Sequence, residues 1–298
     1  MTPILHKSNS PRPVKASFAP LARQKVPMPQ ANDSLQEVAR KFSLTGAADQ
    51  WDRMYRDDTQ RLDEYNFRLR RDFTVRQVLA AARPGARVLD LGCGAGPVIT
   101  ELRGAGLECV GADYSGDMLE FARQRLQSRS LDPAGLVRCD GRSTPFPDAS
   151  FDVVVCLGVI SYVEDYEAIL REIRRLLRPG GTVIISFRNR LNLLLSDPVA
   201  IAKHLLREAL GRREQAAFKI GRFLDFRIVR ARIEALGLKF VALQGIGFGP
   251  FCFAGRALFS ERTSIRISRA LTRVCSRLHL QAAFKWMTDV SIWVYRQP

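Results

Sequence analysis

The stretch that decides the fold is Val88-Leu89-Asp90-Leu91-Gly92-Cys93-Gly94-Ala95-Gly96. Val88, Leu89 and Leu91 are apolar and predict a short buried strand. Three glycines follow at alternate positions, which is typical of a tight turn whose backbone comes close to a ligand, because side chains would block the approach. Pro97 stands where a helix would begin, since its fixed φ suits a first turn. The stretch therefore predicts a strand, a glycine turn and a helix in succession.

Two classes of nucleotide-binding turn compete for this stretch. The dinucleotide fingerprint needs a glycine three residues after the second one, where this chain has Pro97. Asp90 lies two residues before the first glycine, and a carboxylate there would repel a diphosphate and favour a cationic or hydroxyl-rich ligand. An oxidoreductase that binds a nicotinamide dinucleotide is therefore disfavoured.

The same stretch resembles the first motif of the class I S-adenosylmethionine-dependent methyltransferases, in which an acidic residue is followed by Gly-x-Gly-x-Gly. The matching residues are Asp90, Gly92, Gly94 and Gly96. The cofactor of that family has an amino acid end, a sulfonium and no phosphate, which agrees with the charge argument. The resemblance implies that these four residues contact S-adenosylmethionine, with Asp90 at its amino acid end.

A second acidic residue follows the next predicted strand. Leu107–Ala112 predicts that strand, and Asp113 comes directly after it. A carboxylate can accept two hydrogen bonds from a vicinal diol, and the resemblance implies that Asp113 holds the two ribose hydroxyls. Tyr114 and Met118 are expected to contact the adenine.

A third acidic residue follows the predicted strand Leu136–Cys139. The resemblance implies that Asp140 accepts the adenine amino group and that Gly141 offers its backbone to the ring, although a simple turn role for Asp140 stays open. The apolar run Val153–Leu157 predicts a fourth strand that is covered on both faces. Leu157, at its end, completes the expected cofactor contacts.

The acceptor is expected beside residues 158–163, which follow the fourth strand. Many small-molecule members of the family carry a His in this segment, whereas this chain has Tyr162, so no general base is assigned. Tyr162 is one catalytic candidate. Tyr55 is the other, in N-terminal helices that the resemblance places over the cofactor pocket. Ordinary core packing explains such aromatic residues equally well.

The remaining pattern predicts an α/β fold. Further elements are expected at 167–177 (helix), 182–187 (strand), 226–236 (helix), 238–243 (strand) and 289–295 (strand). Strands that alternate with helices predict a doubly wound, mostly parallel seven-stranded sheet, which is the Rossmann-like methyltransferase fold. The resemblance adds an antiparallel last strand beside the sixth. N-terminal helices and a C-terminal insertion complete the expected fold.

Domain boundaries follow from composition. Residues 1–44 hold seven basic and two acidic residues, and the first part is rich in proline without hydrophobic periodicity, so this segment is expected to be disordered. Residues 45–298 are expected to form the methyltransferase domain, with 244–288 as an insertion between the last two strands.

The charge is strongly basic and uneven. The chain has a net charge of +16, and residues 203–298 alone have 18 basic and 6 acidic residues, a net charge of +12. This favours an anionic partner for the C-terminal part, although a solvated Arg-rich surface explains it as well. Residues 264–280 predict a helix with an arginine stripe and an opposite apolar face. The stripe is Arg262, Arg266, Arg269, Arg273 and Arg277, and the apolar face is Ile267, Leu271, Val274 and Leu278. Such a helix can rest on an anionic membrane, grip a lipid-like substrate or pack on the domain.

Several classes of function are disfavoured. The three histidines are scattered without metal-ligand spacing, and the six cysteines form no CxxC, which is typical of buried thiols in a reducing, cytoplasmic compartment. No apolar run reaches the length of a membrane span, and the motifs of nucleic-acid methyltransferases are missing, so no specific nucleic acid is expected.

The sequence therefore predicts methyl transfer from S-adenosylmethionine to a small, hydrophobic or lipid-linked acceptor, with O-methylation favoured and peripheral contact with an anionic membrane. The alternative is a non-catalytic partner or a peripheral-membrane scaffold with the same fold.

Overall fold

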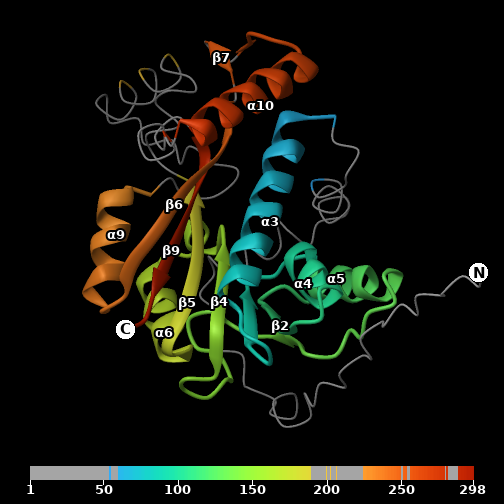
Figure 1. Cartoon of the computed structure of the whole chain (residues 1–298), viewed down its shortest axis with the longest axis vertical. Coiled ribbons are helices and arrows are strands. Elements are labelled where there is room, and N and C mark those ends of the chain that lie inside the picture. Colours follow the sequence, from blue (N-terminus) through green and yellow to red (C-terminus); the bar gives the residue numbers. More distant parts are fainter. Residues whose placement is uncertain are drawn as a thin grey trace, which may run out of the picture.

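The computed structural model describes residues 60–188, 224–249, 251–253, 256–278, 280 and 288–298, together with Met54, Val199, Ala202 and Leu206. The predicted segment 1–44 and the candidate Tyr55 lie outside the described residues. Figure 1 shows a sheet flanked by helices, with one long helix crossing above one end of it.

Seven strands form the main sheet. They are β1 (Arg87–Leu91), β2 (Glu108–Asp113), β3 (Leu136–Arg138), β4 (Phe151–Leu157), β5 (Leu177–Arg188), β6 (Lys239–Phe248) and β9 (Thr288–Arg296). Their order is β3-β2-β1-β4-β5-β9-β6. The pairs from β3 to β5 are parallel, whereas β9 is antiparallel to both β5 and β6. The predicted doubly wound sheet is confirmed, including its antiparallel last strand.

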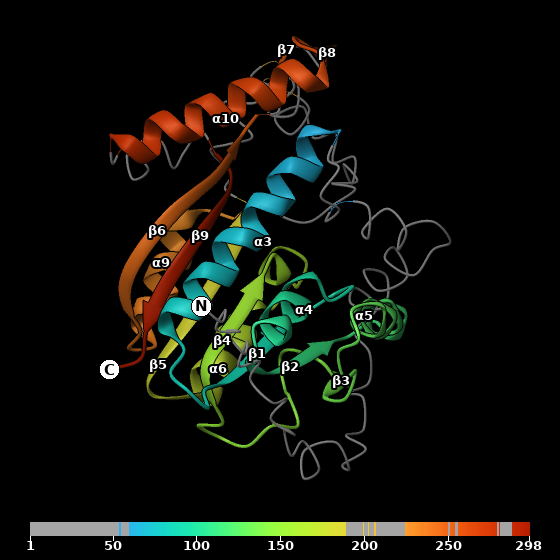
Figure 2. The same ribbon diagram turned by 45° about the vertical axis from the view of Figure 1, so that its right-hand side comes forward.

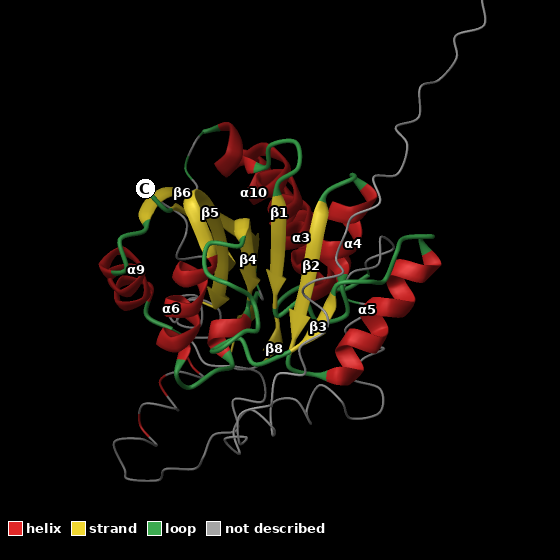
Figure 3. Ribbon diagram, turned by 90° about the horizontal axis from the view of Figure 1, so that it is seen from below, coloured by secondary structure: helices red, strands yellow, loops and turns green. Residues whose placement is uncertain are grey.

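Helices cover both faces of the sheet. They are α3 (Leu62–Ala81), α4 (Pro97–Gly104), α5 (Gly116–Ser128), α6 (Tyr166–Leu176) and α9 (Phe226–Ala235). Val88 and Val153 pack with α3 and α4, whereas the neighbouring Leu89 and Val154 pack with α6 and α9. Successive side chains of a strand point to opposite faces, so each strand contributes to two cores. Seen from below, α6 and α9 lie on one side of the sheet and α3 and α4 on the other (Figure 3).

Helix starts follow local capping chemistry. The Ser115 hydroxyl accepts a hydrogen bond from the Met118 amide, as expected for the N-cap of α5. Asp165 and Asp225 cap α6 and α9 in the same way. Helix α4 begins at Pro97, directly after the glycine turn. Helix α4 therefore starts where the sequence predicts, and α6 starts one residue before the predicted 167.

The predicted insertion at 244–288 begins too early. Strand β6 continues to Phe248 and pairs with β9 up to Thr288, so residues 244–248 belong to the sheet. Glycines in this stretch suggested a loop, but they allow close packing here: a Cβ on Gly245 would lie 2.5 Å from Thr288 Cγ2, and one on Gly247 would lie 2.1 Å from Asn66 Oδ1. The part of the insertion that the structure describes comprises β7 (Cys252–Phe253), β8 (Arg256–Ala257) and α10 (Glu261–Arg277).

Helix α10 crosses over one end of α3 (Figure 2). It runs over 261–277 rather than 264–280, because Ser260 caps it. The predicted apolar face is wrong in part: Val274 and Leu278 are exposed and Ile267 is only half-buried, whereas small residues such as Ser264 and Ser268 make the buried side. The spacing alone does not show which face packs; here that face combines Ile265 with the small residues Ser264 and Ser268.

The structure also describes the helix lengths and the cysteines of part of the chain. Among the described residues, no helix is long and apolar enough to cross a membrane. The cysteines whose burial is described are free buried thiols, as expected: Cys93, Cys109, Cys139, Cys156 and Cys275.

Candidate cofactor and acceptor site

The glycine turn after β1 is tied to the end of β2. The backbone amides of Gly92 and Cys93 both donate to the carbonyl of Ala112, at 2.7 and 3.0 Å. The Gly94 amide donates to Asp113 Oδ2 at 2.8 Å. The ends of two adjacent parallel strands are thereby held together, which is where ligands bind in sheets of this type.

The three glycines serve different purposes. A Cβ on Gly92 would lie 2.1 Å from Val159 Cγ2, and one on Gly96 would lie 2.9 Å from Ala122 Cβ, so these two glycines are required by packing. Gly94 has a φ of +52° and nothing within 4 Å of its Cβ position. Its open side is where a ligand can approach the backbone.

Asp90 is a buried carboxyl group, and one of its two oxygens accepts no hydrogen bond from the described residues. It is 2% exposed, and its Oδ2 has no hydrogen-bond partner in the part of the chain that the structure describes. Burial and the nearby charge of Asp113 raise the pKa of Asp90 to about 7, against the opposing effects of the Ile99 amide and the Arg70 guanidinium. A cationic or hydrogen-bond-donating ligand group would satisfy this oxygen.

Asp113 is positioned at the end of β2 by backbone amides. Its Oδ2 accepts from Gly94, and its Oδ1 accepts from the Ser115 amide at 2.9 Å. Burial raises the pKa of Asp113, while the amides of Ser115, Gly94 and Tyr114 oppose that rise. Each oxygen keeps a further lone pair, so the group can accept two more hydrogen bonds, as a vicinal diol requires.

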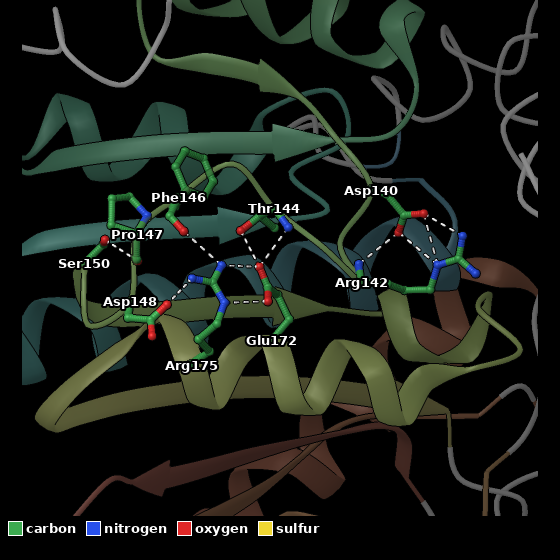
Figure 4. A network of polar contacts seen from close by, with 9 residues as sticks. All are labelled: Asp140, Arg142, Thr144, Phe146, Pro147, Asp148, Ser150, Glu172 and Arg175. Atoms are coloured by element: carbon green, nitrogen blue, oxygen red, sulfur yellow. Dashed lines mark hydrogen bonds and ion pairs between the residues drawn. The ribbon is translucent and has the colours of Figure 1, made fainter. Parts of the chain in front are cut away.

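Asp140 is held in a turn by Arg142. Both of its carboxyl oxygens accept hydrogen bonds from the Arg142 side chain, at 2.6 to 3.1 Å, and Oδ1 also accepts from the Arg142 amide at 2.9 Å (Figure 4). This is the turn role that the sequence left open. The adenine contact of Asp140 and Gly141 stays a prediction, and it would require Asp140 to share its oxygens with Arg142.

A second polar network lies beside this turn (Figure 4). Glu172 of α6 accepts hydrogen bonds from the amide and hydroxyl of Thr144, at 2.7 and 2.6 Å, and from Arg175 at 2.6 Å. Burial alone would raise the pKa of Glu172, but these bonds outweigh it and lower that pKa. Arg175 also binds Asp148. The network fixes the segment after Asp140 against α6.

The other predicted contacts lie near the same sheet edge. Met118 is buried in α5 and Tyr114 is half-buried against the core next to Asp113. Leu157 ends β4, and the half-buried Tyr162 follows the 3-10 turn η1 (Val159–Ser161). The carboxyl ends of β1, β2 and β4 therefore bring these residues to one edge.

Helix α3 adds polar residues that the sequence analysis missed. Asn66, Arg70 and Thr74 are buried and lie at successive turns of one helix face. Asn66 Oδ1 and Thr74 Oγ1 have no hydrogen-bond partner within the described ranges, nor has Ser186 Oγ on β5. Arg70 Nη1 lies 3.3 Å from a Cβ placed on Gly158, directly after β4. Polar residues four apart in a helix expected to cover the site were the available signal.

The hydrogen-bond acceptors at this site fit a phosphate-free nucleoside with a cationic end. Asp90 and Asp113 are acceptors at adjacent strand ends, and Gly94 leaves the approach open. Over the described residues, no cluster of His, Cys, Asp and Glu is arranged to hold a metal ion.

Comparison with known proteins supports a methyltransferase domain in this chain. A family model described as a methyltransferase domain matches residues 89–185. The demethylmenaquinone methyltransferase of Thermus thermophilus is 37% identical over 109 residues, which cover 36% of this chain and 49% of that protein. The ubiquinone biosynthesis O-methyltransferase of Xanthomonas campestris is 31% identical over 139 residues, which cover 47% of this chain and 57% of that protein. The chain thus spans about half the length of the curated relatives it matches.

The fold has a counterpart among solved structures. Magnesium protoporphyrin IX methyltransferase from Synechocystis PCC 6803, with bound S-adenosylhomocysteine, superposes with a TM-score of 0.59 at 18% identity, covering 89% of this chain and 100% of the other. At that identity the likeness shows the fold alone. Residues 89–185 thus form a methyltransferase domain of the class I S-adenosylmethionine-dependent type, whose cofactor is S-adenosylmethionine.

Proposed function

We propose that this chain transfers a methyl group from S-adenosylmethionine to a small, hydrophobic or lipid-linked acceptor, with an oxygen atom favoured as the methylated atom. The observation that carries the proposal is the buried Asp90 oxygen without a partner among the described residues, on the strand that leads into the open glycine turn. A buried, unmet acceptor is costly unless a ligand satisfies it, which supports a binding site at this point.

The cofactor supplies a methyl group made electrophilic by its sulfonium. On the protein side, Asp113 would hold the ribose hydroxyls and Asp90 the amino end, while the open side of Gly94 admits the ligand against the backbone. Tyr114, Met118 and Leu157 would supply apolar contacts to the rest of it. These roles are supported by the burial and placement of the residues at one sheet edge.

The acceptor would lie beside the residues that follow β4. The Tyr162 phenol can both donate and accept a hydrogen bond, so it can orient an acceptor hydroxyl. Asn66 and Thr74 of α3 offer further polar atoms without partners inside the described ranges. With no histidine in residues 158–163, the main contribution of the protein would be alignment of the acceptor and exclusion of water. Tyr55 remains the other candidate.

The acceptor class is supported by the names of two relatives, a demethylmenaquinone methyltransferase and a ubiquinone biosynthesis O-methyltransferase. The second name also favours oxygen as the methylated atom. A lipid-linked acceptor resides in a bilayer, so the proposal includes a cytoplasmic enzyme that makes peripheral contact with an anionic membrane. The net charge of +12 over residues 203–298 is consistent with that contact.

A non-catalytic partner or membrane scaffold is the second candidate. Two observations favour it: the Asp140 oxygens are engaged by Arg142, and residues 158–163 hold no histidine. Such a protein would keep the fold and lose methyl transfer.

Calorimetric titration with S-adenosylmethionine tests the cofactor part of the proposal. Asp113→Ala should weaken binding at least about tenfold, because a charge-assisted hydrogen bond contributes about 1.5–3 kcal/mol. Glu120→Ala is the matched control, since this exposed carboxylate lies on α5 and pairs only with surface residues in the described structure. Equal affinities of the wild type and Asp113→Ala would refute the assignment of Asp113.

Transfer itself is tested with S-adenosylmethionine carrying a radiolabelled methyl group, incubated with quinol and other lipid extracts. Label recovered as a methyl ether in the organic phase is the expected result. Cofactor binding without transfer to any extract would favour the non-catalytic candidate. A product labelled on carbon or nitrogen would keep the enzyme and correct the methylated atom.

A further inference from the structure

Helix α10 leaves two apolar side chains, Val274 and Leu278, exposed at its C-terminal end. The face packed against β6 and α3 is made by Ser264, Ile265, Ser268 and Cys275. In contrast, Val274 is 50% exposed and Leu278 is 61% exposed. A surface helix normally buries its large apolar residues and exposes its small polar ones. Here that order is partly reversed, so apolar surface stays in contact with water.

Buried hydrogen bonds fix this orientation. The fully buried Ser268 Oγ accepts from the Phe248 amide at 2.9 Å, which anchors α10 to the end of β6. Glu261 Oε2 accepts from the Leu62 amide at 2.9 Å, which anchors the start of α10 to the start of α3. Rotating the helix to bury Val274 would break the Ser268 bond and leave the Phe248 amide without a partner.

A second exposed apolar pair adjoins the start of α10. Leu258 is 58% exposed and Phe259 is 45% exposed, in the turn that links β8 to the Ser260 cap. The β7–β8 pair lies at the same end of the molecule as α10, beyond the tip of α3 (Figures 1 and 2). Apolar side chains therefore lie exposed at both ends of this helix.

Between these apolar residues, the exposed side of α10 has a strong excess of positive charge. Its five arginines are Arg262, Arg266, Arg269, Arg273 and Arg277, all exposed. The only acidic residue of the helix is Glu261, which is engaged with Leu62. Five guanidinium groups against a single carboxylate at the start of the helix favour an anionic surface as the partner.

A groove lies between α10 and α3, with a volume of about 580 Å³. Its lining residues are Tyr65, Arg68, Leu69, Asp72, Arg269, Thr272 and Arg273. The guanidinium groups of Arg68 and Arg269 lie 5.7 and 5.6 Å from the centre of the Tyr65 ring. Three arginines against one aspartate give this groove the charge that a phosphate group requires.

We propose that α10 and the turn before it form a docking surface for an anionic lipid bilayer, with the groove receiving a lipid phosphate headgroup. The docking surface is made by Leu258, Phe259, Arg262, Arg266, Val274, Arg277 and Leu278. Arginines at headgroup level and apolar side chains that reach below it are the combination a bilayer surface accommodates. This inference rests on the membrane contact in the proposed function and is independent of methyl transfer.

The exposed apolar residues favour lipid over a soluble polyanion. A nucleic acid would be met by arginine and by aromatic side chains for stacking, and of the seven residues of the docking surface only Phe259 is aromatic. Leu258, Val274 and Leu278 gain nothing from a phosphate backbone, but they do gain from an acyl boundary.

Sedimentation of the full chain with vesicles tests the proposal. Vesicles of phosphatidylcholine mixed with phosphatidylglycerol should bind the protein, and vesicles of phosphatidylcholine alone should bind it at least tenfold more weakly. The triple variant R262Q/R266Q/R277Q should lose at least tenfold in affinity for the anionic vesicles. The matched control R123Q/R129Q/R171Q removes the same charge from exposed positions on and beside α5 and α6, and its affinity should stay within twofold of the wild type.

Two further variants examine the other parts of the surface. V274S/L278S should weaken binding most at about 1 M salt, where the Debye length falls to about 3 Å and the apolar contribution remains. R269Q/R273Q should reduce the preference of the protein for vesicles that contain phosphatidylglycerol. If the groove alone holds the protein on the vesicle, soluble glycerol 3-phosphate should displace the protein; if the apolar side chains also insert, it should displace the protein only in part. If glycerol 3-phosphate binds as tightly as the anionic vesicles do and displaces the protein completely, the groove would be assigned to a free phosphate compound, and the docking proposal would be overturned.

Other results would also overturn the proposal. These are equal losses in the two triple variants, equal binding to both vesicle types, or tight binding of a single-stranded RNA probe without vesicle binding. Thermal unfolding confirms that each variant is folded. Calorimetry with S-adenosylmethionine on the same variants should give wild-type affinity, so that a failure of docking and a failure of the proposed function are read separately.

Discussion

At the residue scale, Gly94 allows the proposed cofactor contact to be tested separately from folding. Its Cβ position faces open space, so Gly94→Ala should cost only the strain of a positive φ, about 1 kcal/mol, while its methyl group obstructs the ligand. We expect S-adenosylmethionine affinity to fall at least about tenfold, since van der Waals overlap of one methyl group costs about 1–3 kcal/mol. Calorimetry measures the affinity and thermal unfolding measures the strain.

Gly85 provides the control for this substitution. It also has a positive φ, of +77°, and nothing within 4 Å of its Cβ position, but it lies in the turn between α3 and β1. Gly85→Ala should lower stability to a similar extent and leave cofactor affinity unchanged. Wild-type affinity in Gly94→Ala would mean that the ligand does not approach this side of the turn.

The three strand-end carboxylates show how far single residues could be predicted. Asp90 was identified from its place two residues before the glycine turn and Asp113 from its place directly after an apolar strand, and the structure leaves both with capacity for further hydrogen bonds. Asp140 has the same sequence context, yet Arg142 two residues later binds its oxygens. Chain position predicts where a carboxylate lies, but its partners depend on side-chain conformations that the pattern does not encode.

At the element scale, Glu172 links α6 to the segment after β3. Glu172→Gln removes the charge that holds Thr144 and Arg175, so we expect a loss of about 2 kcal/mol in unfolding free energy at neutral pH. Because the folded pKa of Glu172 is lowered, this stabilisation is present above the ordinary pKa of 4.5 and is lost as the pH falls through the folded value. Denaturant unfolding of Glu172→Gln and the wild type across this range measures it.

Glu167→Gln is the matched control on the same helix. Glu167 is partly exposed and pairs with Arg232 at 3.1 Å, a surface contact that contributes about 0–1 kcal/mol. A loss in Glu167→Gln as large as that in Glu172→Gln would mean that any charge change on α6 destabilises the protein, rather than the Thr144 contact.

Elements with a clear hydrophobic pattern were predicted well, whereas elements in which glycines or small residues pack against a neighbouring element were not. Val153–Leu157 is a continuous apolar run and forms the central β4 as expected. Strand β6 was ended too early because Gly245 and Gly247 were interpreted as breakers, although they admit Thr288 and Asn66. Helix α10 follows its predicted amphipathic period but packs through Ile265 and small residues rather than through Val274 and Leu278. Which face is buried depends on the neighbouring element, and no local pattern carries that information.

At the scale of the whole molecule, binding and docking are assigned to different parts of the chain. The residues proposed to bind the cofactor lie at the carboxyl ends of β1, β2 and β4, in a segment with balanced charge. The docking surface lies on α10, which contacts α3 and β6. Helix α3 joins the two, because the Tyr65 ring contacts Arg269 while Arg70, five residues further along, lies beside Gly158. An acceptor drawn from a bilayer would thus enter at the end of the molecule where α3 begins.

The stability of the whole molecule should depend on pH through Asp90. Burial and the charge of Asp113 raise its pKa from 3.8 to about 7, so between these values the folded protein binds a proton that the unfolded chain has released. Stability therefore falls as the pH rises from about 4 to about 7 and is lowest above that range. Asp90→Asn removes this titration, and groups common to both proteins cancel in the comparison.

We expect Asp90→Asn to gain about 2–3 kcal/mol of unfolding free energy over the wild type between pH 5 and pH 8, from about 1.4 kcal/mol per pH unit. Denaturant unfolding at both pH values measures this difference, with the exposed Asp132→Asn as control. Saturating S-adenosylmethionine should stabilise the wild type more than Asp90→Asn at pH 8, because the cationic end of the ligand favours the ionised carboxyl group. If the unfolding free energies of the two proteins change with pH in the same way, Asp90 is ionised in the folded protein at little cost. The argument that a ligand contacts Asp90 would then lose its physical basis.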